Sequence, residues 1–262
     1  MGGRVRCRVM GERAGKAHRS SREKVTGEGR PGEAVSNRLQ TLTLPTVQVA
    51  LDVPRLTSAL SVAAACYRSG VRMLEAGTPL VKNEGLRAVS RLKRKFGKAV
   101  IVADLKTLDA GWLEVELAAV AGADVVTISG LADSATVEGA LGAAKKYGVA
   151  TMIDMLGVKR LLPLAKRFER RGADAICIHL GLDAQRATRD TVARKLGEIA
   201  RIAKSVSIPV AVAGGIVPGS AKALVEAGAR VLIVGSAVYS SRTPGRVASS
   251  LLREVSEARQ RL

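Results

Sequence analysis

From Val47 onward, short apolar runs alternate with longer stretches in which apolar residues recur with a helical period. The runs are four or five residues long and rich in β-branched side chains, which favours buried strands. Eight runs predict strands: 47–51, 71–74, 99–103, 125–128, 149–153, 175–178, 210–213 and 231–234. Amphipathic stretches predict helices near 55–69, 84–96, 112–121, 134–146, 159–171, 190–204, 218–227 and 244–258.

Eight consecutive strand–helix units predict a closed parallel barrel, the (β/α)8 TIM barrel, over residues 43–262. Several predicted helices end in a glycine before the next strand, as at Gly122 and Gly172. Glycine ends helices readily because it adopts the left-handed conformation at little steric cost. The alternative architecture is an open, doubly wound sheet.

Residues 1–42 have a different composition, rich in Arg, Gly, Ser and Glu, and show neither period. They predict a flexible basic extension. An Arg- and Ser-rich start also resembles an organelle transit peptide, but Glu12, Glu23, Glu28 and Glu33 argue against that interpretation. Met10 offers an alternative translation start.

Composition narrows the class of protein. Lys and Arg outnumber Asp and Glu by 42 to 23, and the net charge of +19 attracts anions such as phosphorylated metabolites or nucleic acid. Aromatic residues, which stack on bases, make up only 2%, so nucleic acid stays the weaker alternative. No apolar stretch is long enough to span a membrane. Three scattered cysteines suit reduced thiols, so we expect a cytoplasmic protein.

Ionisable residues follow five of the predicted strands: Asp52, Glu75, Asp104, Asp154 and His179. Because the carboxyl ends of barrel strands converge on one face, these groups are expected to meet there. A single acidic residue at such a place often caps a helix, but five ionisable residues in equivalent positions favour a functional site.

The densest group is Asp104 and Lys106, which share a face if the strand continues with its period of two. A lysine among carboxylates stays cationic and can donate a hydrogen bond to a developing oxyanion. A surface salt bridge is the alternative. Glu75 and Asp104 lie on adjacent predicted strands, and their hard oxygen ligands suit Mg²⁺ or Mn²⁺.

Glycines mark the loops after the last two predicted strands, with Gly214 and Gly215 after the seventh and Gly235 and Ser236 after the eighth. Glycines let backbone N–H groups approach an anion. Barrel enzymes commonly bind phosphate in these two loops. The pattern therefore predicts a phosphate site.

These positions resemble the 3-hexulose-6-phosphate synthases of the orotidine 5′-monophosphate decarboxylase suprafamily. The resemblance rests on Asp52, Glu75-Ala76-Gly77-Thr78-Pro79, Asp104-Leu105-Lys106-Thr107-Leu108-Asp109-Ala110-Gly111, His179 and Ala213-Gly214-Gly215-Ile216. Orotidylate decarboxylases usually carry a lysine where this chain has Glu75. The related 3-keto-L-gulonate 6-phosphate decarboxylases typically have Glu, Arg and Thr where this chain has Asp154, Leu182 and Ala213.

The resemblance implies a metal-dependent aldehyde-lyase that joins ribulose 5-phosphate and formaldehyde into D-arabino-hex-3-ulose 6-phosphate, or runs in reverse. Asp52, Lys106, Asp109 and His179 would be catalytic, with His179 as the base. Glu75 and Asp104 would hold the metal, Mg²⁺ or Mn²⁺, that stabilises an enediolate together with Lys106.

The same resemblance implies that Asp154 and the two glycine loops bind the sugar phosphate. It also implies a homodimer in which Asp109 lies near the interface and reaches the neighbouring site. A 3-keto-L-gulonate 6-phosphate decarboxylase is the alternative enzyme, and a nucleic-acid-binding protein the alternative class.

Overall fold

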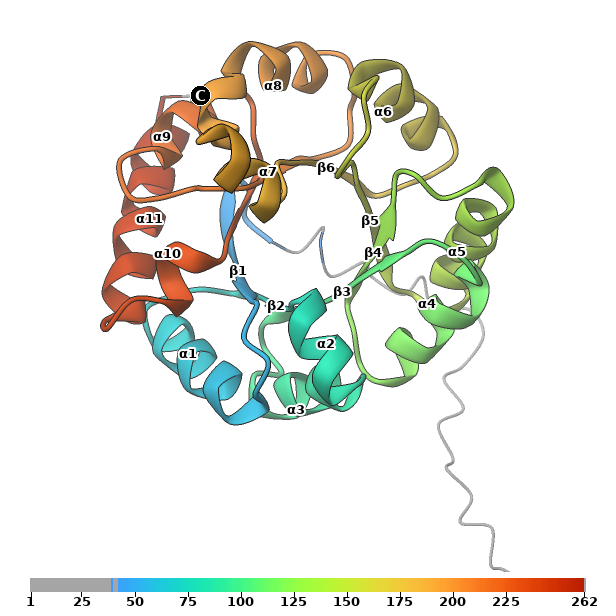
Figure 1. The fold of residues 1–262 in the computed structure, drawn as a ribbon, viewed down its shortest axis with the longest axis horizontal. Helices are drawn as coiled ribbons and strands as arrows, with labels where there is room; N and C mark the ends of the chain where they lie inside the picture. The colour runs from blue at the N-terminus through green and yellow to red at the C-terminus, as the bar shows by residue number, and fades with distance from the viewer. Residues whose placement is uncertain (1–38, 40–41, 262) are drawn as a thin grey trace, which may run out of the picture. The chain divides into compact units, whose positions relative to one another are not determined.

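The computed structural model describes Leu39 and residues 42–261. Eight parallel strands pair in chain order, and β8 closes on β1, so the predicted (β/α)8 barrel is confirmed and the open sheet is wrong (Figure 1). The strands are β1 (Thr46–Leu51), β2 (Met73–Ala76), β3 (Val100–Thr107), β4 (Val125–Ser129), β5 (Ala150–Asp154), β6 (Ala175–His179), β7 (Val210–Ala213) and β8 (Val231–Val234).

Helices that alternate with the strands form the outer ring of the barrel (Figure 1). They are α1 (Leu56–Arg68), α3 (Arg87–Lys95), α4 (Gly111–Val120), α5 (Ser134–Tyr147), α6 (Leu161–Arg170), α8 (Leu196–Ala203), α9 (Ala221–Glu226) and α11 (Pro244–Arg259). A 3₁₀ turn, η1 (Val192–Lys195), precedes α8. No helix in the described part of the chain has the length and apolar character of a membrane span.

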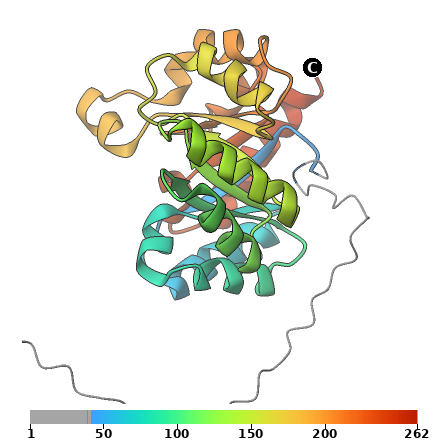
Figure 2. The same ribbon diagram turned by 90° about the vertical axis from the view of Figure 1, so that its right-hand side faces the viewer.

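Three short helices were not predicted: α2 (Thr78–Glu84), α7 (Leu182–Thr188) and α10 (Ser236–Tyr239). They lie closer to the barrel axis than the outer ring (Figure 1), and α2 and α7 project from the same end of the barrel (Figure 2). Each covers only four to seven residues, about one or two turns, so its helical period is weak. These helices follow β2, β6 and β8 and therefore border the carboxyl ends of the strands.

The side chains inside the barrel change character along the strands. β2 turns Met73 inward before Glu75, and β6 turns Ala175 and Cys177 inward before His179. Apolar groups thus fill the N-terminal half of the interior, while ionisable groups collect at the carboxyl ends. The outward-facing strand residues pack against the helices and form the larger core.

Leucines close the N-terminal end of the barrel interior. Leu39 is 3% exposed and packs, with Leu42 and Leu44, in the cluster that contains Met73 and Val100. The barrel core therefore takes in Leu39 and Leu42 from the segment predicted as a flexible extension, and the rest of that segment lies outside the described residues.

Candidate active site

A cavity of about 350 Å³ opens at the carboxyl ends of the strands. Nine of the eleven predicted site residues line it, and α2, α7 and α10 contribute further walls. The nine are Asp52, Glu75, Asp104, Lys106, His179, Gly214, Gly215, Gly235 and Ser236. The remaining two, Asp109 and Asp154, lie outside its lining.

Three carboxylates from the first three strand ends form a compact cluster. Asp52, Glu75 and Asp104 each place one oxygen within 4.8 Å of the others. Burial, and then the charges of Asp104 and Asp52, raise the pKa of Glu75 well above its ordinary value. Burial and the charge of Asp104 also raise the pKa of Asp52. Mutual repulsion among hard oxygen donors fits a site for Mg²⁺ or Mn²⁺.

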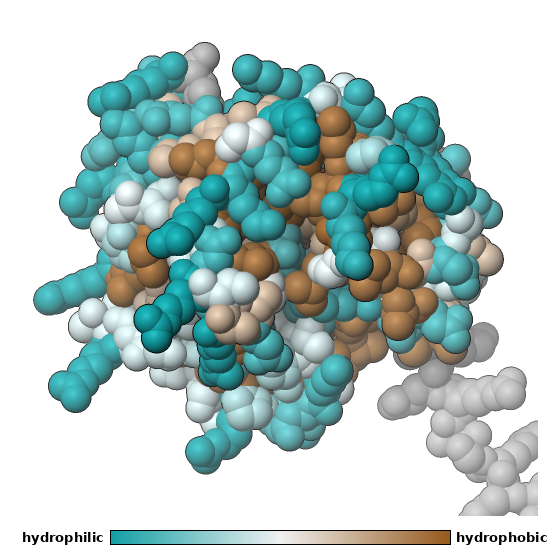
Figure 3. All heavy atoms as spheres, turned by 45° about the horizontal axis from the view of Figure 1, so that its top comes forward, coloured by the Kyte–Doolittle hydropathy of each residue, from teal (hydrophilic) through white to brown (hydrophobic). Residues whose placement is uncertain are grey.

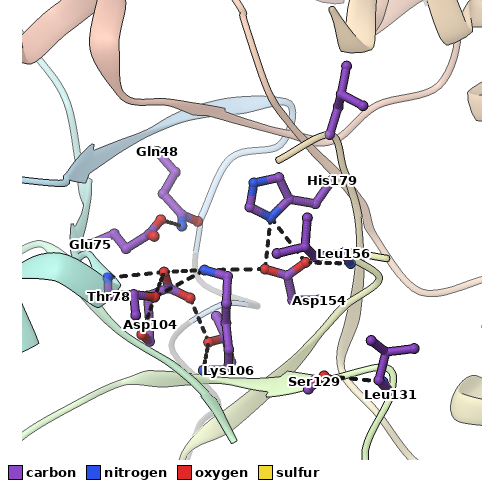
Figure 4. Close-up of polar contacts among 12 residues, drawn as sticks. Gln48, Glu75, Thr78, Asp104, Lys106, Ser129, Leu131, Asp154, Leu156 and His179 are labelled. Atoms are coloured by element: carbon purple, nitrogen blue, oxygen red, sulfur yellow. Dashed lines mark hydrogen bonds and ion pairs between the residues drawn. The ribbon is translucent and has the colours of Figure 1, made fainter. Parts of the chain in front are cut away.

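Gln48 lies beneath this cluster and is fully buried. Its Nε2 donates a short hydrogen bond to Glu75 Oε2 (Figure 4), which fixes the orientation of that carboxylate. Its Oε1 has no hydrogen-bond partner within the described part of the chain. The sequence did carry a signal for this residue, because Gln48 is the one polar residue within the predicted strand 47–51.

Lys106 lies between two carboxylates. Its Nζ is 2.5 Å from Asp104 Oδ2 and 3.5 Å from Asp154 Oδ2 (Figure 4). Burial opposes its charge, but the carboxylates of Asp104, Asp154 and Glu75 outweigh that effect and raise the pKa of Lys106 above its ordinary value. The ammonium group is therefore charged, as predicted, and points into the cavity.

Asp104 is held from three sides. Thr78 Oγ1 donates to its Oδ2 at 2.7 Å and Thr127 Oγ1 to its Oδ1 at 2.8 Å. Burial would raise the pKa of Asp104, but the Lys106 charge and these hydrogen bonds lower it below the ordinary value. Asp104 is thus ionised, with its side chain held at the start of α2 by Thr78 N and Thr78 Oγ1.

The backbone of β3 departs from the predicted geometry around Lys106. Regular pairing with β4 shifts between Ala103 and Thr107, and Lys106 has a left-handed φ of 47°. Lys106 N donates to Thr127 Oγ1 at 2.9 Å, which supports this conformation. β3 thus extends four residues beyond the predicted end at Ala103, through a bulge, and period-two alternation alone does not describe it.

His179 is oriented by Asp154. Its Nδ1 lies 2.9 Å from Asp154 Oδ2 and 3.1 Å from Oδ1 (Figure 4). A carboxylate only accepts hydrogen bonds, so Nδ1 carries the proton and Nε2 of a neutral ring is a free base. Leu156 N donates to Asp154 Oδ1 at 2.9 Å and holds the carboxylate in place.

Asp154 was expected among the groups that bind substrate. The structure instead places it, 4% exposed, beneath the cavity, where it is engaged by His179, Leu156 and Lys106. The physical reason is that Asp154, the last residue of β5, pairs with Cys177, two residues before the cavity residue His179. Asp154 therefore contacts His179 and Lys106 rather than the cavity.

Asp109 was expected to be catalytic, but within this chain it lies away from the cavity. It is exposed, its Oδ1 accepts a hydrogen bond from Ala110 N at 2.7 Å, and it borders a separate hollow near Trp112. The loop leaves the barrel after Thr107, and Ala110 adopts a left-handed conformation before α4. Asp109 therefore does not line the cavity of its own chain.

The two glycine loops follow the neighbouring strands β7 and β8 and line the cavity, with Gly235 next to Asp52. Gly214 and Gly215 have φ of 117° and 70°, a region that side chains disfavour. A Cβ on Gly214 would lie 2.4 Å from Leu180 O, and one on Gly235 would lie 3.1 Å from Asp52 Oδ2. Small residues thus keep this wall open.

Three further cavity residues were given no role from the sequence: Thr78, Gln185 and Tyr239. Gln185 Nε2 donates to Leu180 O at 2.7 Å, which ties α7 to the end of β6. Thr78 directly follows the strand end that carries Glu75, so its position could have been inferred. Gln185 and Tyr239 lie on the short helices that no periodicity revealed.

The barrel and its carboxylate–lysine–histidine cavity define a class of enzyme. Residues 45–251 match the family described as orotidine 5′-phosphate decarboxylase / HUMPS, and the chain belongs to this family, as the sequence resemblance implied. A relative named 3-hexulose-6-phosphate synthase, from Methylomonas aminofaciens, is 36% identical over 181 residues, which are 69% of this chain and 85% of the relative.

Solved structures show the same likeness. A crystal structure of 3-hexulose-6-phosphate synthase superposes with a TM-score of 0.76 at 33% identity, covering 80% of this chain and 99% of that chain. A crystal structure of KGPDC from Streptococcus mutans, solved as a complex with a ligand, has a TM-score of 0.76 at 25% identity, covering 82% of this chain and 98% of that chain. The synthases are thus the more similar group in sequence.

Proposed function

We propose that this chain is a 3-hexulose-6-phosphate synthase, an aldehyde-lyase that joins ribulose 5-phosphate and formaldehyde reversibly and depends on Mg²⁺ or Mn²⁺. The observation that carries the proposal is the arrangement of Lys106 and the His179–Asp154 pair around one cavity, beside three clustered carboxylates. The identity to synthases of that name supports it.

His179 is the base in this proposal. With Nδ1 bound to Asp154, Nε2 accepts the proton from the first carbon of ribulose 5-phosphate. Asp154 orients the ring and stabilises the imidazolium that results. The loss of that proton leaves an enediolate, whose first carbon forms the new bond to the formaldehyde carbon, and a proton then passes to the formaldehyde oxygen.

Lys106 stabilises the negative charge that develops on the substrate oxygens. Its ammonium group is charged and already fixed by Asp104 and Asp154, so little reorganisation is needed during the reaction. Glu75 and Asp104, with Asp52 beside them, would hold the divalent cation, which supplies Lewis-acid polarisation of the substrate oxygens when bound. The all-oxygen donor set fits such an ion.

The phosphate group of the substrate is proposed to bind against Gly214, Gly215, Gly235 and Ser236. These residues line the cavity at the ends of β7 and β8, and glycine backbones permit close approach of an anion. The cavity volume of about 350 Å³ suits a small sugar phosphate.

A homodimer is part of the proposal. Leu113, Leu117 and Val120 project from one side of α4 at helical spacing and are 53%, 48% and 77% exposed. Figure 3 shows hydrophobic side chains gathered at the surface on the side where Figure 1 places α4 and α5. An exposed apolar face of this kind favours association, and Asp109 lies directly before it in the chain.

We further place the protein in the cytoplasm, because the two cysteines of the described chain, Cys66 and Cys177, are buried free thiols. Buried reduced thiols suit a reducing compartment.

An assay in both directions tests the function. The purified protein with Mg²⁺ should consume ribulose 5-phosphate only when formaldehyde is present, and EDTA should abolish the reaction. Lys106→Ala should lower kcat by about 10²–10³-fold, since a donor to the developing oxyanion is lost. Faster release of carbon dioxide from 3-keto-L-gulonate 6-phosphate than consumption of formaldehyde would replace this proposal by the decarboxylase alternative.

A further inference from the structure

A second group of metal-binding side chains lies at the base of the cavity. Asp154, Cys177 and His179 each place one ligand atom within 4.8 Å of the other two. Among the described residues, this group and the carboxylate cluster are the two sets of three such ligands that come this close. The donors differ in kind, because one set is all oxygen and the other offers oxygen, sulfur and nitrogen.

The strand register explains why these three side chains meet. Asp154 of β5 pairs with Cys177 of β6, so both point to the same side of the sheet. His179 follows Cys177 by two residues and shares its face. The three line a small hollow that shares Glu75, Asp104, Lys106 and His179 with the main cavity.

We propose that Asp154, Cys177 and His179 form a binding site for a thiophilic divalent cation such as Zn²⁺ or Cd²⁺, separate from the carboxylate cluster, and that its occupation inhibits the enzyme. Thiolate and imidazole ligands select such ions, whereas Mg²⁺ and Mn²⁺ prefer the oxygen cluster. Bonds of about 2.0–2.2 Å in a tetrahedral zinc site separate two ligand atoms by about 3.4 Å, so His179 Nδ1 and Asp154 Oδ2, now 2.9 Å apart, need to move apart by only about 0.5 Å.

Binding of the cation displaces one proton and moves another. The thiol of Cys177 releases its proton to solvent, and the cation takes the place of the Nδ1 proton between His179 and Asp154. The ring stays neutral, so the proton displaced from Nδ1 is carried on Nε2 instead. The nitrogen that accepts the substrate proton in the proposed function is thereby blocked.

Two features limit the affinity of this site. Lys106 Nζ lies 3.5 Å from Asp154 Oδ2, and its charge repels a cation there. Burial, and then the charges of Asp154 and Glu75, raise the pKa of Cys177 well above its ordinary value, so the thiol must be deprotonated at a cost. Both effects favour reversible inhibition rather than a permanent structural ion.

Cadmium is a suitable probe because its bond to a thiolate absorbs in the ultraviolet. The protein is prepared with Cys7→Ala and saturated with Mg²⁺, and Cd²⁺ is titrated while thiolate absorption and synthase activity are recorded. We expect absorption and inhibition to develop together. Cys177→Ala should weaken both by at least about tenfold, because a ligand is lost.

Cys66→Ala is the matched control. Cys66 is also a fully buried thiol, but it lies on α1 in the layer between helices and barrel. Its variant should bind Cd²⁺ as the parent does. Cys177→Ser, which keeps the side-chain volume and offers a poor ligand for cadmium, should reproduce the loss seen for Cys177→Ala and guards against a folding defect.

Equal Cd²⁺ affinity in the parent and in both Cys177 variants, or the absence of a thiolate absorption that depends on Cys177, would overturn the site. The inhibition rests on the proposed function, whereas the absorption does not require activity. A protein that shows the absorption but no synthase activity would therefore contradict the proposed function and leave the metal site standing.

Discussion

The ionisation and orientation of the Glu75 carboxylate depend on its buried neighbours. A carboxylate that is 5% exposed and faces Asp104 and Asp52 is costly to ionise, and Gln48 is the group that donates a hydrogen bond to it from below. Metal-binding carboxylates are generally oriented by such partners. Gln48 thus acts on the proposed metal site through Glu75.

Gln48→Leu should weaken Mn²⁺ binding by about 10–100-fold, since the supporting hydrogen bond to Glu75 is lost. Titration followed by electron paramagnetic resonance measures this affinity directly. Thr107→Val is the control, because it also replaces a buried polar side chain by an apolar one. Thr107 Oγ1 has no hydrogen-bond partner among the described residues, so this substitution removes no support from a proposed metal ligand. Unchanged Mn²⁺ affinity in Gln48→Leu would show that Glu75 needs no such support.

Asp154→Asn separates orientation of the base from metal binding. An amide can donate a hydrogen bond to Nδ1 of His179, whereas a carboxylate can only accept one. The ring can therefore carry its proton on Nε2, which faces the substrate. We expect kcat to fall on the order of 10²-fold or more, as for loss of a general base. Steady-state kinetics measure the loss, and Mn²⁺ affinity should stay near that of the parent because Asp154 lies outside the carboxylate cluster. A normal kcat would contradict the positioning role.

At the scale of single residues, the sequence was sufficient to find groups that follow strand ends. It could not show which of them face substrate and which face one another. Asp154 and Asp52 are both acidic residues at strand ends, but only the structure reveals that Asp154 is engaged by His179 and Lys106. Such a distinction depends on the height of each residue along the barrel axis.

The elements were predictable where their pattern was long and regular. β7 and β8 have the predicted bounds, whereas β3 continues to Thr107 because a bulge carries it past the apolar run. The helix predicted at 84–96 begins only at Arg87, as α3, because Gly85 with a φ of 63° ends α2 just before it. Local backbone changes of this kind leave little trace in hydrophobic periodicity.

The contact between α4 and α5 depends on a glycine. A Cβ at Gly111 would lie 2.0 Å from Thr136 O, so the helices would have to separate. Gly111→Ala should therefore lower the free energy of unfolding by about 1–3 kcal/mol, measured by chemical denaturation. In contrast, Gly197→Ala in α8 meets no atom within 4 Å and should raise stability by about 0.4–1 kcal/mol. Equal effects of the two substitutions would refute the packing explanation.

For the whole molecule, the eight strand–helix units correctly predicted a closed barrel, while the expectation of a dimer came only from the family resemblance. Within one chain, Asp109 has no route to the cavity lining, and the apolar side of α4 stays uncovered. A proposed dimer accounts for both features.

Leu117→Glu should dissociate the proposed dimer, because a charge would replace an apolar side chain that is 48% exposed on α4. Analytical ultracentrifugation should show a shift from dimer to monomer at micromolar protein. Val217→Glu places the same charge at an apolar residue that is 49% exposed on the loop after β7, and it should leave the dimer intact. A monomeric parent protein, or dimers in both variants, would contradict this interface.

Leu39, Leu42 and Leu44 have a practical consequence for anyone who shortens the protein. A protein shortened to begin at residue 39 keeps the leucines that close the N-terminal end of the barrel. One that begins at Thr46 lacks them, and we expect water to reach Met73 and Val100. A truncation placed at the start of β1 would therefore disturb the apolar interior of the barrel, which supports the ionisable groups at the carboxyl ends of the strands.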